Sequence, residues 1–257
     1  MSNRFEDGSA GDADYGSIGG SYATFRQPEP RIAAKIHAAL SDARKVLNVG
    51  AGAGSYEPAD RDVTAVEPSA SMRRQRPVHL SPAIDAVAEA LPFPDKSFDA
   101  TMTTFSVHQW SDLEAGLREM RRVTKGPVII LSCDPDCVQD FWLNDFAPGV
   151  LGAEERRYPA LDRMDRALGS GTTIMPVPIP LDCVDGFNEA YYGRPEKLLE
   201  APARLSCSAW SFVDEATSNG YVAALQDALR SGRWDARYGA LRTQPEFDGS
   251  LRLIVSV

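Results

Sequence analysis

Apolar residues form two kinds of pattern along the first part of the chain, a helical spacing and short continuous runs. After residues 28–30, Ile32, Ile36 and Leu40 recur every four positions among small and polar residues. This spacing is typical of one apolar stripe on a helix. Short apolar runs with β-branched residues follow at 45–49 and 62–68. We therefore predict a helix followed by two strands.

The same alternation continues to about residue 135. Residues 97–107 (SFDATMTTFSV) and 126–135 (GPVIILSCDP) have the composition of buried strands. The segment between them has the pattern of an amphipathic helix, with apolar residues at Leu113, Leu117, Met120 and Val123. Strands that alternate with helices in this way are typical of a parallel, doubly wound α/β sheet.

The pattern is looser in the second half of the chain. Two stretches resemble helices around 141–168, and 172–180 (TTIMPVPIP) resembles a strand whose prolines restrict it to a sheet edge. The final LRLIVSV predicts a closing strand. We expect a flexible tail at 1–20 and one domain over 21–257, with 137–171 and 182–250 as inserted segments that form a lid and bind substrate.

Composition narrows the classes of protein that fit. The 257 residues carry a net charge of −9 and show no basic stripe, which argues against a nucleic-acid partner. No apolar run approaches membrane-spanning length, so we expect a cytoplasmic monomer or homodimer without membrane contact. The closely spaced pair Cys133 and Cys137 has no second pair or histidine nearby to complete a zinc site, and we expect no metal.

The strongest local signal is the glycine-rich segment 48–54 (NVGAGAG). Its three glycines follow a strand and allow the backbone to turn tightly and approach a ligand closely. A dinucleotide fingerprint would need its third glycine at Ser55, so the spacing disfavours a nicotinamide or flavin enzyme. Glu67 ends the second strand, where a carboxylate can accept both hydroxyls of a ribose.

Four motifs in order give the chain a family resemblance. VLNVGAGAGSYE, VTAVEPSASM, AEALPFPDKSFDATMTTFSVHQW and LREMRRVTKGPVII resemble the successive motifs of small-molecule class I S-adenosylmethionine (SAM)-dependent methyltransferases, of the type 11 or UbiE-like kind. Together they cover about residues 45–135. The resemblance implies a Rossmann-like fold with a mainly parallel seven-stranded sheet, helices on both faces and an antiparallel C-terminal strand.

The resemblance also implies how S-adenosyl-L-methionine is held. The glycine turn would cradle the methionyl part, Glu67 the ribose, and Pro68 with Met72 the adenine, while Arg26 would meet the methionine carboxylate. The full implied set is Tyr22, Arg26, Asn48, Gly50, Ala51, Gly52, Glu67, Pro68, Met72, Ala88, Glu89, Thr104 and Phe105.

Two positions depart from the family pattern. Relatives usually carry an acid where Asn48 stands, and another acid, which takes the adenine amino group, where Val87 stands. Asn48 keeps an acceptor oxygen, whereas Val87 cannot form a hydrogen bond. Loss of one such contact weakens binding by about 1 kcal/mol, so we expect cofactor binding to survive.

In the family, the segment after the fourth strand lines the methyl-transfer side of the pocket. In this chain the corresponding segment is 104–110, at the end of the strand predicted at 97–107. Here His108 is its leading polar residue, either as a general base with a pKa near neutrality or as a packing or capping histidine. Asp134 lies at the end of the strand predicted at 126–135, which is the fifth strand of the family, and it either binds substrate or caps the next turn. The expected substrate-binding residues are Tyr15, His108, Asp134, Trp142, Tyr191 and Tyr192.

The resemblance implies a SAM-dependent methyltransferase that moves a methyl group to an O, N or C atom of a small organic metabolite. A role in secondary metabolism fits this substrate class. Two alternatives stay open, since a fold does not fix a function. One is a module that binds SAM without catalysis, and the other is an enzyme of this fold whose chemistry does not transfer a methyl group.

Overall fold

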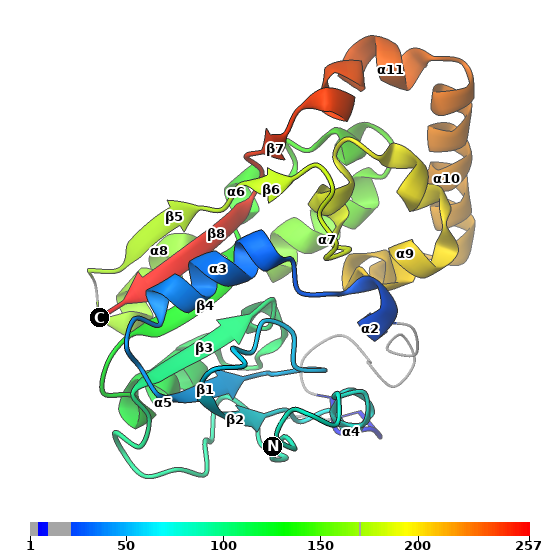
Figure 1. Ribbon diagram of the computed structural model, residues 1–257. Helices are drawn as coiled ribbons and strands as arrows, with labels where there is room; N and C mark the ends of the chain where they lie inside the picture. Colours follow the sequence, from blue (N-terminus) through cyan, green and yellow to red (C-terminus); the bar gives the residue numbers. More distant parts are fainter. Residues whose placement is uncertain (1–4, 10–21, 170) are drawn as a thin grey trace.

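The computed structural model describes residues 5–9, 22–169 and 171–257, and the side chains of residues 22 and 23 are not described (Figure 1). Its main sheet has six strands in the order β2-β1-β3-β4-β8-β5. The strands are β1 (Lys45–Val49), β2 (Asp62–Val66), β3 (Ala100–Thr104), β4 (Val128–Cys133), β5 (Thr173–Pro176) and β8 (Leu251–Ser256). The first four are parallel, and β8 lies antiparallel between β4 and β5. The predicted mainly parallel sheet with an antiparallel C-terminal strand is confirmed.

The expected count of seven strands in this sheet is wrong for the described residues. Beyond β2 the sheet continues only as a single parallel bridge between Val66 and Ile84. The Ile84 N–H donates to Ala65 O and its carbonyl accepts from Glu67 N, each at 2.9 Å. Pro82, two residues before Ile84, has no N–H to donate, and Ile84 is 42% exposed. Little apolar burial is therefore available to extend a strand there.

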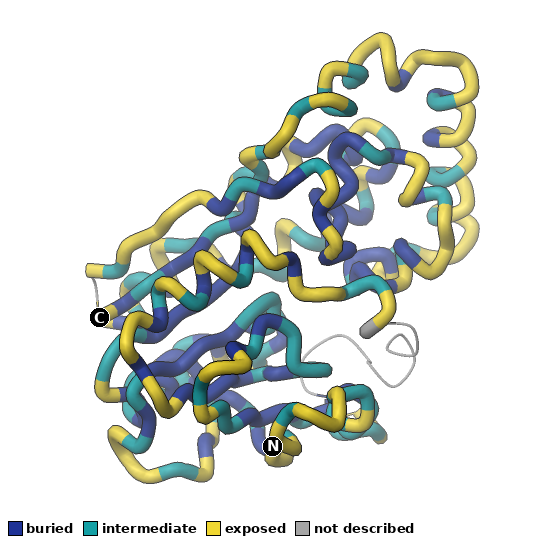
Figure 2. The backbone as a smooth tube through the Cα atoms, viewed as in Figure 1, coloured by how far each residue is buried: buried dark blue, intermediate teal, exposed yellow. Residues whose placement is uncertain are grey.

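Helices cover both faces of the sheet, as predicted (Figure 2). β4 is buried along its whole length, with Ile129 facing one layer and Ile130 the other. On the first face lies α3 (Pro30–Ala39), whose Ile32 and Ile36 confirm the predicted apolar stripe. On the second face lie α5 (Leu113–Val123) and α8 (Leu161–Leu168), which pack against each other.

The rest of the second half forms a lobe at one end of the sheet (Figure 1). We call residues 135–157 and 179–249 the cap. Its helices are α6 (Pro135–Val138), α7 (Pro148–Arg157), α9 (Ala201–Leu205), α10 (Glu215–Arg230) and α11 (Arg233–Tyr238). A two-stranded sheet pairs β6 (Ile179–Pro180) with β7 (Glu246–Phe247). The proline-containing β5 lies at the edge of the main sheet, where its sequence predicted it.

Short 3₁₀ helices connect these elements. They are η2 (Val107–Gln109), η3 (Trp142–Asp145), η4 (Asn188–Tyr191), η5 (Pro195–Leu199), η6 (Ser208–Phe212) and η7 (Gly239–Thr243). Two short α-helices, α2 (Tyr22–Phe25) and α4 (Ala70–Arg74), complete the described elements. In the described part of the chain, no helix combines the length and the apolar character that crossing a bilayer requires.

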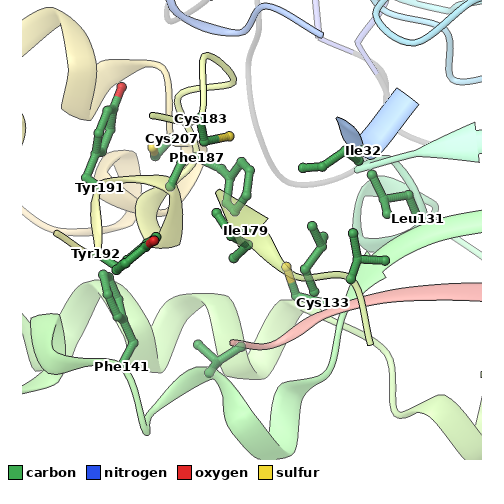
Figure 3. Packing of buried hydrophobic residues seen from close by; sticks show 14 of the residues in the cluster. Ile32, Leu131, Cys133, Phe141, Ile179, Cys183, Phe187, Tyr191, Tyr192 and Cys207 are labelled. Carbon is green, nitrogen blue, oxygen red and sulfur yellow. The ribbon is translucent and has the colours of Figure 1, made fainter. Parts of the chain in front are cut away.

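Aromatic and aliphatic side chains of the cap pack together with residues of the sheet, among them Phe141, Phe187 and Tyr192 (Figure 3). The rings of Trp142 and Trp234 lie 5.4 Å apart at nearly a right angle. Trp142 Nε1 donates to the carbonyl of Tyr192 at 2.9 Å, and the Tyr192 ring stacks on Phe247 at 5.1 Å. These contacts bury large apolar rings and satisfy the indole N–H of Trp142, so this cluster stabilises the cap.

Candidate active site

A cavity of about 820 Å³, partly open to solvent, lies at the carboxyl ends of β1, β2 and β3. This edge is where open α/β sheets bind ligands. Most of the residues expected to hold a cofactor line this cavity: Arg26, Gly50, Ala51, Gly52, Glu67, Pro68, Met72, Ala88, Glu89, Thr104 and Phe105. The walls also include Ser106, Gln109 and Trp110, from the segment expected to line the methyl-transfer side. Four further wall residues were not pointed to by the sequence: Ser9, Ser55, Tyr56 and Ser69.

The glycine turn after β1 needs glycine for two reasons at Gly50. Its φ is +66°, a conformation that other residues rarely adopt. A Cβ there would also lie 1.9 Å from Ser106 Oγ. At Gly52 the φ is +52°, and a Cβ would lie 3.3 Å from Met72 Cε. The bare backbone therefore forms a narrow cradle in the cavity wall.

Glu67 links the end of β2 to this turn. Its Oε2 accepts from the Gly52 N–H and its Oε1 from the Ser69 N–H, both at 2.8 Å. Burial raises the pKa of the carboxyl above its usual range, although these two hydrogen bonds and the charge of Arg73 oppose the rise. Each carboxylate oxygen has two lone pairs, so both retain capacity to accept a further hydroxyl.

Residues 5–9, within the segment expected to be a flexible tail, pack against the loop after β2. The Asp7 carboxylate accepts from Ser69 Oγ at 2.6 Å and from Ser71 Oγ at 2.8 Å. Burial would raise the Asp7 pKa, but the hydrogen bonds from Ser69, Ser9 and Ser71 outweigh it and hold the pKa well below its usual range. The neighbouring Ser9 thereby becomes part of the cavity wall. For the other residues of 1–20, the tail stays a prediction.

Arg26 is held in the cavity wall by a residue of the cap. Its Nε lies 2.5 Å from Asp185 Oδ1, and Tyr56 Oη donates to Asp185 Oδ2 at 2.7 Å. The guanidinium lies 4.8 Å from the centre of the Phe105 ring, in a cation–π contact. The sequence predicted Arg26 but gave no sign of Asp185, which is 159 positions away in a stretch without periodicity.

The other end of the cavity is more apolar. Pro68, Met72, Val87 and Ala88 line it together with Glu89. Glu89 Oε1 accepts from Ser111 Oγ at 2.8 Å and from Asp112 N at 3.1 Å, so this carboxylate also fixes the loop before α5. The amide of Gln109 lines the same cavity, where Val87 itself offers no hydrogen-bonding group.

These residues fit a SAM molecule. The narrow glycine cradle, the carboxylate of Glu67 and the apolar end match its methionyl chain, ribose and adenine in turn. Asn48 lies under the turn without lining the cavity, and its Nδ2 donates to Glu57 Oε1 at 3.0 Å. Its Oδ1 is buried and has no hydrogen-bond partner among the described residues.

His108 lies in η2, just after β3, and its ring centre is 4.7 Å from that of Tyr158. The side chain is partly exposed but does not belong to the wall of the cofactor cavity. Burial lowers its pKa well below the usual value, and the charges of Arg157 and Arg26 lower it further. The imidazole is therefore neutral at neutral pH and able to accept a proton.

Two carboxyl groups of the cap lie near each other and near Cys133, at the end of β4. Burial raises the pKa of Glu154 to about 7, and the charge of Glu189 adds to the effect. Glu154 Oε1 accepts from Asn188 Nδ2 at 2.9 Å. Glu189, whose pKa burial also raises to about 7, accepts from Ser250 N at 2.9 and 3.1 Å and from its hydroxyl at 2.9 Å. Glu189 thus anchors the start of β8 through both of its oxygens. Glu154 uses one of its two oxygens in the hydrogen bond from Asn188.

Three expected substrate residues are structural instead. Asp134 caps α6 by accepting from Asp136 N at 3.2 Å and pairs with Arg252 at 3.4 Å, which confirms the capping alternative. Trp142 and Tyr192 lie in the aromatic centre of the cap, because burial of their rings there is more favourable than exposure to a pocket. Tyr191 is also buried, at 5% exposure. Tyr15 and the side chain of Tyr22 lie outside the described residues.

Comparison of the chain with known proteins finds methyltransferases. A family model for a methyltransferase domain matches residues 47–131. A solved structure from Anabaena variabilis ATCC 29413, described as a methyltransferase from an antibiotic biosynthesis pathway, is 30% identical with a TM-score of 0.85. That similarity covers 91% of this chain and 99% of the other.

Two curated relatives match part of the chain. The uncharacterized methyltransferase YcgJ of Bacillus subtilis (strain 168) is 32% identical over 40% of this chain and 45% of its own length. The demethylmenaquinone methyltransferase of Renibacterium salmoninarum is 40% identical over 32% of this chain and 37% of its own length. The chain thus matches less than half the length of these curated relatives. With the full-length structural match, it belongs to the class I SAM-dependent methyltransferases, and its cofactor is SAM.

Proposed function

We propose that the protein transfers a methyl group from SAM to an O, N or C atom of a small organic acceptor. The observation that carries the proposal is the shared wall between cavity and cap. Arg26 and Phe105 line the cofactor cavity, and the same two residues contact Asp185 and Phe187 of the cap. An acceptor enclosed by the cap would therefore meet the methionyl end of the cofactor.

The residues of the chain have distinct roles in this proposal. Gly50 and Gly52 bind the methionyl part through the backbone, Glu67 binds the ribose hydroxyls, and Pro68 and Met72 pack on the adenine. When bound, SAM supplies a methyl group on a sulfonium that carries its own leaving group. The protein then has to align the acceptor, exclude water and remove a proton where the acceptor atom needs it.

His108 is the proposed base. Its low pKa keeps the imidazole neutral, so it can accept a proton from a hydroxyl, an amine or a carbon acid. Tyr158, in ring contact with His108, keeps its proton at neutral pH because burial raises its pKa, and it can donate a hydrogen bond to the acceptor.

Glu154 adds an acceptor group to this region. It keeps some accessible surface, burial raises its pKa to about 7, and its Oε1 accepts from Asn188 Nδ2. We expect it to orient a hydroxyl or amine of the substrate. The structure from Anabaena variabilis, described with antibiotic biosynthesis, supports an acceptor from secondary metabolism.

A product assay tests the proposal. The protein is incubated with SAM and a panel of phenols, amines, thiols and β-dicarbonyl compounds, and products are read by mass spectrometry. The proposal predicts S-adenosylhomocysteine together with an acceptor that has gained one CH₂, both lost in Glu67→Ala. Turnover of an acceptor without that gain favours another chemistry on this fold. SAM binding without turnover of any acceptor favours a binding module.

A further inference from the structure

We propose that Asp185 of the cap is a positioning residue for cofactor binding. It holds Arg26 in the orientation that receives the carboxylate of the cofactor's amino-acid end, and Tyr56 holds Asp185 in turn. The inference rests on the cofactor site described above, and it adds a residue of the cap to that site.

Asp185 binds one edge of the Arg26 guanidinium. Nε and Nη2 of the guanidinium face Asp185, with Nε 2.5 Å from Oδ1 and Nη2 3.4 Å from Oδ2. This side-on arrangement uses one edge of the planar fork, so the end that carries Nη1 is directed away from Asp185. A ligand carboxylate in the cavity that Arg26 lines would therefore bind Nη1 or the outer N–H of Nη2.

Three further contacts fix this orientation. Phe105 lies under the guanidinium at 4.8 Å, so the fork is held flat against a ring. The backbones of Arg26 and Asp185 form an antiparallel bridge, and Gly186 N donates to Phe25 O at 2.8 Å. Tyr56 Oη donates to the second Asp185 oxygen at 2.7 Å. A side chain restrained in this way loses little conformational entropy when it binds a carboxylate.

Both side chains of the Arg26–Asp185 pair are buried. The Arg26 side chain is 9% exposed and that of Asp185 is 2% exposed. A buried guanidinium without its carboxylate would be an uncompensated charge, and the side chain would leave this position or the cap would shift. Tyr56 stays protonated as a donor because burial, followed by the charge of Asp185, raises its pKa well above the usual value.

The arrangement couples the cap to the cofactor. Asp185 belongs to the segment that would enclose the acceptor, whereas Tyr56 follows the glycine turn. A ligand carboxylate on Arg26 would therefore favour the docked position of this cap segment. A nucleoside without the carboxylate would not.

Calorimetric titration with two ligands tests the proposal. One is S-adenosylhomocysteine, and the other is S-adenosyl-3-thiopropylamine, which keeps the adenosine and the ammonium but lacks the carboxylate. For Asp185→Asn we expect S-adenosylhomocysteine to bind about tenfold to a hundredfold more weakly, and the decarboxylated analogue to change less than about twofold. Tyr56→Phe should show the same selectivity with a smaller loss.

Asp182→Asn is the matched control. Asp182 lies in the same loop and pairs with Arg31 at 2.7 Å, but it is exposed and Arg31 does not line the cavity. Both ligands should keep their wild-type affinity in this variant. In Arg26→Ala, the further change Asp185→Asn should cause no additional loss for S-adenosylhomocysteine, because the two residues act as one unit.

Three outcomes would overturn the inference. Equal weakening of both ligands in Asp185→Asn would mean that the pair only stabilises the cap. Unchanged affinity would mean that Asp185 does not act on the cofactor. Tighter S-adenosylhomocysteine binding would mean that Asp185 competes for Arg26. Failure of the wild type to bind either ligand would instead contradict the cofactor site itself.

Discussion

The backbone N–H of Gly52 donates a hydrogen bond to the Glu67 carboxylate at 2.8 Å. This contact joins the glycine turn after β1 to the end of β2, so the two strongest sequence signals meet in one wall of the cavity. Any change that moves the turn also moves the group expected to bind the ribose.

Gly50→Ala tests how closely the turn is packed. The new Cβ would meet Ser106 Oγ at 1.9 Å, on a backbone with φ +66°. We expect the free energy of unfolding to fall by at least about 2 kcal/mol and S-adenosylhomocysteine binding to be lost. Urea denaturation and calorimetry measure the two effects.

Gly220→Ala is the control for this substitution. Gly220 lies in α10, and a Cβ there would have no neighbour within 4 Å. The variant should gain about 0.5–1 kcal/mol of stability, because alanine favours a helix over glycine, and bind the cofactor normally. Equal behaviour of the two variants would show that the glycine turn is not the constraint.

His108→Gln tests the proposed base. With an acceptor found by the product assay, we expect kcat to fall by about 10² to 10⁴. The affinity for S-adenosylhomocysteine should stay unchanged, because His108 does not line the cofactor cavity. Protonation of His108 should not lower the wild-type rate down to pH 6.5, since its pKa lies well below that value, so a change near pH 7 would reflect Glu154. A kcat within twofold of wild type would reduce His108 to a packing residue.

Glu154→Gln tests the buried carboxyl of the cap through the pH dependence of stability. The folded pKa of about 7 lies above the usual 4.5, so between these values the folded protein binds more protons than the unfolded chain. This group therefore destabilises the fold progressively as pH rises from about 4.5 to about 7.

Replacement by glutamine removes this dependence and keeps an oxygen for Asn188 Nδ2. Between pH 5 and pH 8 the wild type should lose about 1–3 kcal/mol more unfolding free energy than Glu154→Gln. Glu155→Gln removes an exposed carboxyl of the same helix and should behave as wild type. If Glu154→Gln and the wild type have parallel pH profiles, Glu154 is not enclosed as described.

Local signals carried much of the fold and of the cofactor wall. The helical period of apolar residues marked α3 and α5, and short apolar runs marked the central strands, because burial on one or both faces leaves these patterns in the sequence. The glycines and Glu67 were found because a tight turn and a strand-ending acid leave a mark on the sequence itself. The number of strands was harder to predict. Ile84 is exposed at the sheet edge and forms a single bridge there, and this exposure leaves no pattern in the sequence.

Long-range partners left no such mark. Asp7 and Asp185 act through contacts with Ser69 and Arg26 that join distant segments, and neither acid stands in a periodic pattern. Aromatic composition also could not separate core from pocket. Trp142 resembles a substrate-binding residue in sequence, yet Trp234 and Tyr192 enclose it.

The most direct test of the account is calorimetric titration of the wild type and Glu67→Gln with S-adenosylhomocysteine. Glutamine keeps the size of the side chain but replaces one acceptor oxygen with a donor and removes the charge. The account predicts micromolar binding by the wild type and a loss of about tenfold or more in the variant, whose amide nitrogen would face the N–H of Gly52 or Ser69. Absence of binding by the wild type, or equal binding by both proteins, would contradict the assignment of this cavity to SAM.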